Sequence, residues 1–464
     1  MWPAAKSEEQ LRLCAHSCND NGEVTVTENK DTDRDMNGRT IGILGHPWRA
    51  NVTVAGDIYP LGDELPIRWY VAADDRWHTP ADEVAVRQTA VSGTPVLETR
   101  LRVPGGDVIQ RLWVASGRQG SSALMMEFEN DSPMAVAVAI SHDDLLVSRP
   151  VAVRNVSGEW PAPGLELDQV PTVLPVGHRT SVRAALVLSG SSPTINIEDF
   201  ANHDSVARGW VALSDSASRF NLPDVIESIP AGDVIVAERS ELALSPAPNV
   251  FTNGEDCARW LMSQRELQRM SLSQVDPVDL AGAIEVLARA TRRNKISRAL
   301  AMDGFRSALF LLGTDQERAV SDFSKLLAKA LSLRGQSLAQ MLARKNDDGV
   351  RGFLQVTSIE NELALLTDEN VATLLPNGFP TNRLGVQFEV HDIAVGAQHR
   401  VSFAVRWHGP NAAVLWEVVG PAGLILRSGV DPSWSSTQSS GEALWKVENV
   451  PTAAIIENQN LSFS

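Results

Sequence analysis

Residues 98–140 carry the pattern that most restricts how this chain can fold. They read ETRLRVPGGDVIQRLWVASGRQGSSALMMEFENDSPMAVAVAI, alternating apolar and polar positions with breaks at Pro104-Gly105-Gly106 and at residues 117–122. Period-two alternation interrupted by turn residues is typical of consecutive antiparallel strands. The pattern assigns one buried face to Val103, Val108, Leu112 and Val114. It points four polar side chains away from that face: Arg100, Arg102, Gln110 and Arg111.

Similar short strands are predicted on both sides of this stretch. The earlier ones are residues 40–44, 50–54, 65–72 and 84–91, and the later ones are residues 145–156, 170–176, 179–189 and 233–241. Residues 199–216 have helical or irregular character. More than eight short strands at regular spacing predict a large two-sheet sandwich rather than a small barrel.

The pattern changes near Asn253, where apolar residues begin to recur at helical spacing. Asn253 or Thr252 is a candidate N-cap for the first helix, and Asp276-Pro277 is a start signal for the second. Five or six helices are predicted: residues 255–270, 276–293, 295–312, 314–333 and 337–344, with 359–366 as a candidate sixth. Short turns between them indicate an array of antiparallel helical hairpins.

Strand alternation returns at residue 385. Five strands are predicted there: residues 386–390, 399–407, 412–419, 423–427 and 443–447. The predicted fold class is therefore α+β, mainly β, with a large N-terminal antiparallel β-supersandwich, a short α-helical hairpin array and a C-terminal β-sandwich. The predicted parts are an N-terminal extension (1–38), the supersandwich (39–250), the helical section (251–384) and the C-terminal sandwich (385–464).

Charge and cysteine content narrow the classes of partner. The net charge is −16 and no basic block offsets it, so we expect neither nucleic acid nor an anionic membrane surface as a partner. The cluster Cys14-x-His16-x-Cys18 lacks a second Cys/His pair to complete a four-ligand zinc site, so no metal is predicted. No phosphate-binding or dinucleotide-binding glycine motif occurs, and no cofactor is predicted. Three cysteines and no apolar run of signal or membrane-spanning length predict a cytoplasmic protein.

Tryptophan supplies the candidate binding residues, because the chain has 12 Trp and only 2 Tyr. The densest mixture of aromatic, imidazole and acidic side chains comprises Trp407, His408, Trp416, Glu417, Asp431 and Trp434, and Trp77-His78 repeats the same residue types in an earlier turn. A flat indole ring beside hydroxyl-binding groups suits a sugar, so these residues form a predicted carbohydrate platform. The alternative is that Trp407 and Trp416 fill the core of the C-terminal sandwich while Trp434 anchors a loop.

Two passages add a resemblance to a known group of enzymes. The phrases DIYPLGDELPIRWYVAADDRWHTP, ETRLRVPGGDVIQRLWV and LMMEFENDSPMAVAVAI, within residues 57–140, resemble the N-terminal supersandwich of glucoamylase-type and related inverting glycoside hydrolases and phosphorylases. The passage HRVSFAVRWHGPNAAVLWEVVGPAGLILRSGVDPSWSSTQSSGEALW resembles a small β module that ends some bacterial proteins associated with these families. The resemblance implies a glycosidase-like architecture. Residues 254–367, however, hold only about half the helices of the (α/α)6 barrel of those enzymes, and no catalytic residue carries over.

Three functions follow as hypotheses. The first is a cytoplasmic glycan-associated protein without catalytic activity, which binds an oligosaccharide or a protein partner. The second is an active inverting α-glycosidase, a glycoside hydrolase whose site is completed by sandwich loops or by another subunit in a homo-oligomer. The third is a structural or assembly protein. The link to sugars in these hypotheses comes only from the resemblance in fold. Two opposed carboxyl groups at one pocket would favour the active glycosidase.

Overall fold

The structure is a computed structural model and describes residues 38–150, 171–190, 195–249, 251–313, 316–333, 335–342 and 353–447. Its fold is α+β with several mainly antiparallel sheets, as the sequence predicts. The predicted extension, apart from Gly38, lies outside the described residues, and with it the cluster Cys14, His16 and Cys18. No helix in the described ranges is both long and apolar enough to cross a membrane.

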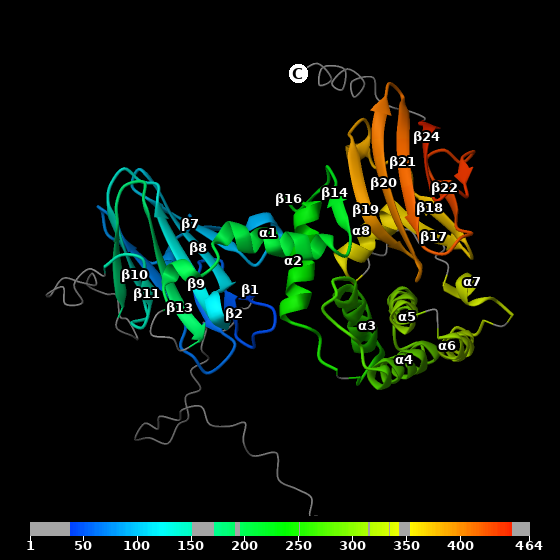
Figure 1. Ribbon diagram of the computed structural model, residues 1–464, viewed down its shortest axis with the longest axis horizontal. Coiled ribbons are helices and arrows are strands. Elements are labelled where there is room, and N and C mark those ends of the chain that lie inside the picture. The colour runs from blue at the N-terminus through cyan, green and yellow to red at the C-terminus, as the bar shows by residue number, and fades with distance from the viewer. Residues whose placement is uncertain are drawn as a thin grey trace, which may run out of the picture. The chain divides into compact units, whose positions relative to one another are not determined.

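The N-terminal sandwich consists of three sheets (Figure 1). Its strands are β1 (Arg39–Gly42), β2 (Arg49–Val52), β3 (Ile58–Pro60), β4 (Trp69–Ala72), β5 (Trp77–His78), β6 (Arg87–Ala90), β7 (Leu97–Val103), β8 (Gly106–Ser116), β9 (Ser122–Asn130), β10 (Val136–Ile140), β11 (Leu146–Val147), β12 (Thr172–Val176) and β13 (Ser181–Ser189). The six-stranded sheet has the order β11-β13-β9-β8-β7-β6, the four-stranded sheet β12-β10-β4-β5, and the three-stranded sheet β1-β2-β3. The predicted strands thus form a large antiparallel sandwich.

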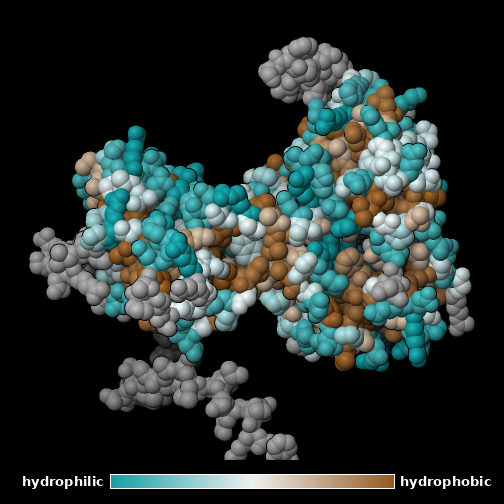
Figure 2. Space-filling model, in the orientation of Figure 1, coloured by the Kyte–Doolittle hydropathy of each residue, from teal (hydrophilic) through white to brown (hydrophobic). Residues whose placement is uncertain are grey.

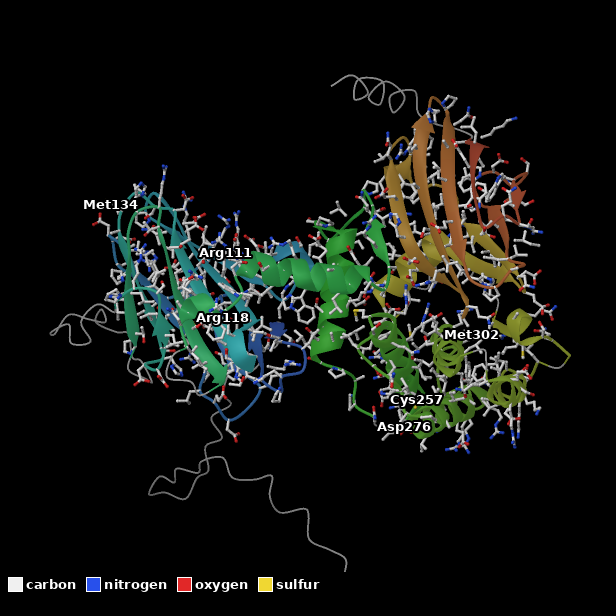
Figure 3. The ribbon with its side chains drawn as sticks, viewed as in Figure 1. Arg111, Arg118, Met134, Cys257, Asp276 and Met302 are labelled. Atoms are coloured by element: carbon white, nitrogen blue, oxygen red, sulfur yellow. The ribbon has the colours of Figure 1, made fainter. Side chains whose placement is uncertain are left out.

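The hairpin of β7 and β8 is the predicted one. Val103 pairs with Gly106 across the two-residue turn Pro104-Gly105, and Gly105 has a φ of 80°, which favours glycine. The predicted core face is confirmed for its four apolar residues, Val103, Val108, Leu112 and Val114, none more than 4% exposed. On the opposite face of β8, Arg111 pairs with Glu98, Glu127 and Glu129 (Figure 3).

The predicted orientation of Gln110 is wrong. Alternate residues of a strand share one face, so Gln110 points inward together with Val108 and Leu112, and it is 1% exposed. Its amide Nε2 donates a hydrogen bond of 3.2 Å to the carbonyl oxygen of Gly56, which offsets part of the cost of burial. Period two therefore decided the face, and the polarity of the side chain did not.

Two helices, one strand and a short hairpin follow the sandwich: α1 (His203–Asp215), β14 (Arg219–Asn221), the hairpin β15 (Val225–Ile226) and β16 (Ile229–Pro230), and α2 (Ala231–Leu244). The predicted strand at residues 233–241 is wrong, because this segment lies in α2. The β-branched residues of Val234-Ile235-Val236 suggested a strand. In α2, however, burial recurs at Ala231, Ile235 and Arg239, the four-residue spacing of a helix face, so tertiary packing overrides local propensity.

The helical array confirms most of the predicted helices. It contains α3 (Gly254–Arg269), α4 (Pro277–Arg292), α5 (Arg298–Leu312), α6 (Glu317–Ala330), α7 (Leu338–Leu342) and α8 (Gln355–Leu363). Both start signals act as expected: the side chain of Asn253 accepts from the N–H of Asp256, and that of Asp276 from the N–H of Val278. Cys257 of α3 and Met302 of α5 lie in the core of this array (Figure 3). The predicted helix at 359–366 instead ends at Leu363, because Ala364 begins a strand.

The C-terminal sandwich packs two further sheets. Its strands are β17 (Ala364–Asp368), β18 (Val371–Leu374), β19 (Phe388–Val395), β20 (His399–His408), β21 (Asn411–Val419), β22 (Ile425–Ser428), β23 (Ser435–Ser436) and β24 (Ser440–Lys446). The five-stranded sheet has the order β14-β19-β20-β21-β24, so β14 joins it from ahead of the helical array. The other sheet has the order β17-β18-β22-β23. Ile235 of α2 and Met262 of α3 belong to the same core, which ties the sandwich to the helices before it.

Candidate functional site

The tryptophans of the predicted platform lie inside the C-terminal sandwich. Trp407 is 8% exposed and Trp416 is 6% exposed. The Trp407 ring meets that of Phe379 at a centroid distance of 5.1 Å, and Trp434 meets Trp416 at 5.1 Å and Trp445 at 5.3 Å. The indole N–H groups of the two buried rings are satisfied internally: Trp407 donates to the carbonyl of Val386 at 2.9 Å and Trp416 to that of Gln438 at 3.2 Å. Trp407 and Trp416 therefore belong to the core, and Trp434 packs partly buried against it.

The polar members of the platform lie elsewhere. His408 and Glu417 are exposed on the outer face of the five-stranded sheet, since they alternate with the buried Trp407 and Trp416. Asp431 fastens its own loop: Oδ1 accepts from the Ser433 hydroxyl at 2.6 Å, and Oδ2 accepts from the N–H of Lys446 at 3.2 Å. The structure therefore separates His408 and Glu417 from the rings of Trp407 and Trp416, whereas Asp431 and Trp434 lie in one loop.

Trp77 and His78 form a packed corner of the N-terminal sandwich. His78 is 3% exposed, and its ring lies between two carboxylates, with Nδ1 2.9 Å from Glu83 and Nε2 3.0 Å from Asp75. Trp77 packs against the small cluster that contains Tyr70. With both ring nitrogens occupied, His78 has no free group for a ligand.

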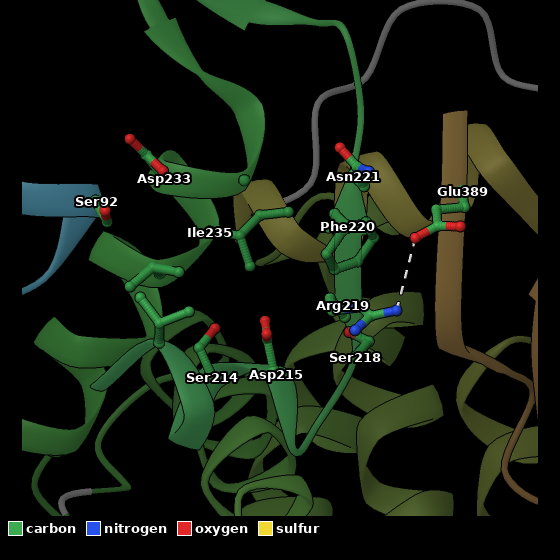
Figure 4. Close-up of a pocket in the computed structure, with 13 residues that line it drawn as sticks. Ser92, Ser214, Asp215, Ser218, Arg219, Phe220, Asn221, Asp233, Ile235 and Glu389 are labelled. Atoms are coloured by element: carbon green, nitrogen blue, oxygen red, sulfur yellow. Dashed lines mark ion pairs between the residues drawn. The ribbon is translucent and has the colours of Figure 1, made fainter. Parts of the chain in front are cut away.

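A different pocket stands out in the described part of the chain (Figure 4). It has a volume of about 380 Å³, within the range of roughly 300–1,000 Å³ typical of small-molecule sites. Its lining comes from the turn before β7, the end of α1, β14, the start of α2, and β19: Ser92, Val211, Ser214, Asp215, Ser218, Arg219, Phe220, Asn221, Gly232, Asp233, Ile235, Val236 and Glu389. Segments from both sandwiches thus share one site, and most of the lining is polar.

The contact of the N-terminal sandwich with α2 depends on Gly93. A Cβ atom at this position would lie 1.9 Å from the carbonyl oxygen of Asp233, and Gly93 has a φ of 71°. Only glycine allows this approach of two backbones. It places the neighbouring Ser92 at one edge of the pocket, beside the first turn of α2 (Figure 4).

The buried side chain of Arg239 holds the opposite wall of the pocket in place. Arg239 of α2 is 0% exposed, and its Nη1 donates to the carbonyl oxygens of Ser214 at 2.9 Å and Ser218 at 2.8 Å. Its Nη2 donates to the Ser218 hydroxyl at 2.7 Å and to Glu266 at 3.3 Å. The guanidinium therefore fixes the backbone on both sides of Asp215 from behind the pocket, and these bonds occupy its N–H groups.

Arg239 belongs to a buried ionic network that joins α2, α3 and α8. Arg269 donates to Glu266 at 2.8 Å and to Glu360 at 2.7 Å, and these three side chains are at most 5% exposed. Ser218 donates to Glu360 at 3.1 Å, which closes the network back onto the pocket. Burial alone would raise the pKa of Glu266, but the guanidiniums of Arg269, Arg239 and Arg265 hold it at about 2.

Two carboxyl groups of the pocket have no partner. The side-chain carboxyls of Asp215 and Asp233 make no hydrogen bond or ion pair with the described residues, and Figure 4 places Asp215 at the base of the pocket and Asp233 across from it, on the side of Ser92. Burial raises the pKa of both, and for Asp215 the charges of Arg219, Arg239 and His391 only partly oppose this. Unpartnered carboxyls with raised pKa values in a pocket are characteristic of functional sites.

We expect Asp215→Asn to stabilise the protein at neutral pH. The folded state holds the Asp215 proton more tightly than the unfolded state, so the folded state loses stability as pH rises from the unfolded pKa near 3.8. An amide avoids the cost of a desolvated charge, and the gain at pH 7 is up to about 1 kcal/mol because solvent partly screens the group. Urea denaturation at pH 7 and pH 4 measures it. A gain equal at both values, or a loss at pH 7, would contradict an unpaired charge.

Arg219 and Glu389 line the pocket on its third side. Arg219 Nη2 lies 3.6 Å from Glu389 Oε1, shown by the dashed line in Figure 4, and donates to His391 Nε2 at 2.8 Å. Phe220 and Asn221, the next residues of β14, supply an aromatic ring and an amide. Cations, carboxyls, hydroxyls and one ring can together bind a small polar molecule in a fixed orientation.

The sequence did not reveal this pocket, because its lining comes from five separated segments that only the fold brings together. The one local signal was the run of small polar residues, Ser214-Asp215-Ser216, at the end of α1. No group of three or more His, Cys, Asp or Glu in the described ranges is arranged to hold a metal ion. Neither the protein-family models nor the curated proteins contain a match to this chain.

Proposed function

We propose that this protein is a glycan-associated protein, related in architecture to glucoamylase-type glycoside hydrolases, that binds a saccharide without hydrolysing it. The observation that carries the proposal is the polar pocket with Asp215 at its base. Its serine, asparagine and carboxyl groups match the many hydroxyls of a sugar, and Phe220 offers a ring for an apolar sugar face.

The helical array supports binding rather than turnover. In the enzymes that the sequence resembles, the site belongs to a closed helical barrel. Here none of the described pocket-lining residues comes from α3 to α8. In Figure 2 hydrophobic side chains gather along these helices, which pack against one another around their own core. This favours a binding site at the junction of the two sandwiches.

One observation favours an inverting glycosidase as the second candidate. Asp215 has a raised pKa, which suits a general acid, while Glu389 is ion-paired with Arg219, which suits a carboxylate base. Environments that differ in this way assign acid and base roles in glycosidases. The same chain would then hydrolyse its ligand, with both carboxyls required.

Calorimetric titration of the full chain with neutral mono- and oligosaccharides, malto-oligosaccharides among them, tests the proposal. Val211→Trp fills the pocket, whereas Ala212→Trp adds the same ring at the next, exposed residue of α1. We expect saccharide binding by the wild type and by Ala212→Trp, and at least about tenfold weaker binding by Val211→Trp. Equal affinities in the two variants, or no binding by any saccharide, would refute the proposal.

The same samples separate the two candidates. Release of reducing ends is measured over a day of incubation. Binding without release supports the first candidate. Release that disappears in both Asp215→Asn and Glu389→Gln establishes the second.

A further inference from the structure

The charged groups that line the pocket do not balance. Asp215, Asp233 and Glu389 contribute three negative charges and Arg219 contributes one positive charge, which leaves a formal charge of −2. Arg219 is already engaged by Glu389 and His391. The lining thus carries more negative charge than it can pair within itself.

The cation behind the pocket cannot supply the missing charge to a ligand. Arg239 is completely buried, and its hydrogen bonds go to Ser214, Ser218 and Glu266. Glu266 also offsets its charge. A ligand in the pocket therefore meets the two unpartnered carboxyls and no free guanidinium from this side.

A desolvated carboxylate without a partner is unfavourable, and a cation brought by the ligand would relieve this cost. A neutral sugar relieves it only through hydroxyl hydrogen bonds, which are weaker than charge-assisted ones. The overall charge of −16 also draws cations to the surface and repels acidic sugars.

Resting on the function proposed above, we propose that the ligand is an amine-bearing saccharide, whose protonated amine lies against Asp215 at the base of the pocket while Asp233 contributes from the opposite side. The sugar hydroxyls then face the serines and Asn221. Amine and hydroxyls together make the ligand class an amino sugar with a free amine, rather than its N-acetylated form.

Three sugars that differ only at one carbon test this directly: glucose, glucosamine and N-acetylglucosamine, each also as its β-1,4-linked disaccharide. Titrations are run at about pH 6, where an amine of this kind is protonated. We expect glucosamine to bind at least tenfold more tightly than either neutral sugar at low salt. The advantage should shrink in about 0.5 M salt, since screening weakens charge interactions at the pocket mouth.

Two variants test whether Asp215 is responsible for the preference for glucosamine. Asp215→Asn should reduce the preference for glucosamine over glucose to about threefold or less. Asp204→Asn, at the exposed start of the same helix, removes an equal charge outside the pocket and should leave the preference intact. Thermal unfolding confirms that each variant is folded before titration.

The outcomes are distinct. Glucose, malto-oligosaccharides and glucosamine binding with equal affinity would overturn the amine preference and leave the proposed function standing. Binding by none of the saccharides would overturn both. A preference that survives in the Asp215→Asn, Asp233→Asn double variant, or butylamine competing as well as glucosamine, would also refute an amino-sugar site.

Discussion

Replacing Glu266 by glutamine is expected to lower the free energy of unfolding by about 3–5 kcal/mol. The carboxylate is 1% exposed and lies 2.8 Å from Arg269 and 3.3 Å from Arg239. A neutral amide of the same shape leaves these buried guanidiniums with insufficient negative charge. Urea denaturation at pH 7 gives the value. Glu285→Gln, on the exposed face of α4, is the matched control and should change stability by no more than about 0.5 kcal/mol.

We also expect Glu266 to make the stability of the protein depend on pH. The folded pKa of Glu266, about 2, lies below the ordinary value of 4.5, so the folded state holds the carboxylate ionised. The ionised carboxylate adds roughly 3 kcal/mol to the free energy of unfolding above pH 4.5, and this stabilisation is lost as the pH falls toward 2. The stability of Glu266→Gln should fall less steeply across that interval than that of the wild type. If the free energy of unfolding fell equally steeply with pH in the wild type and in Glu266→Gln, the ionic network would not be what keeps Glu266 ionised.

Trp416→Ala should cost about 3–5 kcal/mol, the loss typical of a large aromatic ring removed from a core. Trp416 packs on Trp434, and a Cβ atom at Gly441 of the neighbouring strand would lie 2.6 Å from its ring, so the ring fills its space closely. The same variant should retain saccharide binding at the pocket, which Trp416 does not line, if it is assayed well below its unfolding temperature.

His408→Ala is the control for this second substitution. His408 is exposed on the same sheet, and its removal should change stability by at most about 0.5 kcal/mol. If Trp416→Ala were as stable as the wild type and instead lost saccharide binding, the ring would be a binding platform and the assignment to the core would be wrong.

Periodicity predicted the elements whose packing follows local pattern. The β7–β8 hairpin, the caps at Asn253 and Asp276, and the two sandwiches around a helical array all agree with the structure. Each depends on neighbouring residues alone: a turn, a capping side chain, or alternation along one strand. Such features require no knowledge of distant contacts.

The main errors of the sequence prediction occur where contacts between residues far apart in the chain determine the structure. Residues 233–241 form a helix because α2 packs between the two sandwiches and inserts Arg239 into a buried ionic network, which no local pattern announces. Gln110 is an error of another kind, because the alternation along β8 already places it inward; the carbonyl of Gly56 only accepts a hydrogen bond from it there. The pocket depends on the same contacts, since Asp215, Asp233 and Glu389 are adjacent only in the folded chain.

The most direct test of a saccharide site between the two sandwiches is a crystal structure of the full chain with the tightest-binding sugar from the titrations. The account predicts a sugar ring in the pocket, within hydrogen-bonding distance of Asp215 and Asn221. A sugar bound instead on the C-terminal sandwich around His408 and Glu417, with the pocket empty, would contradict it.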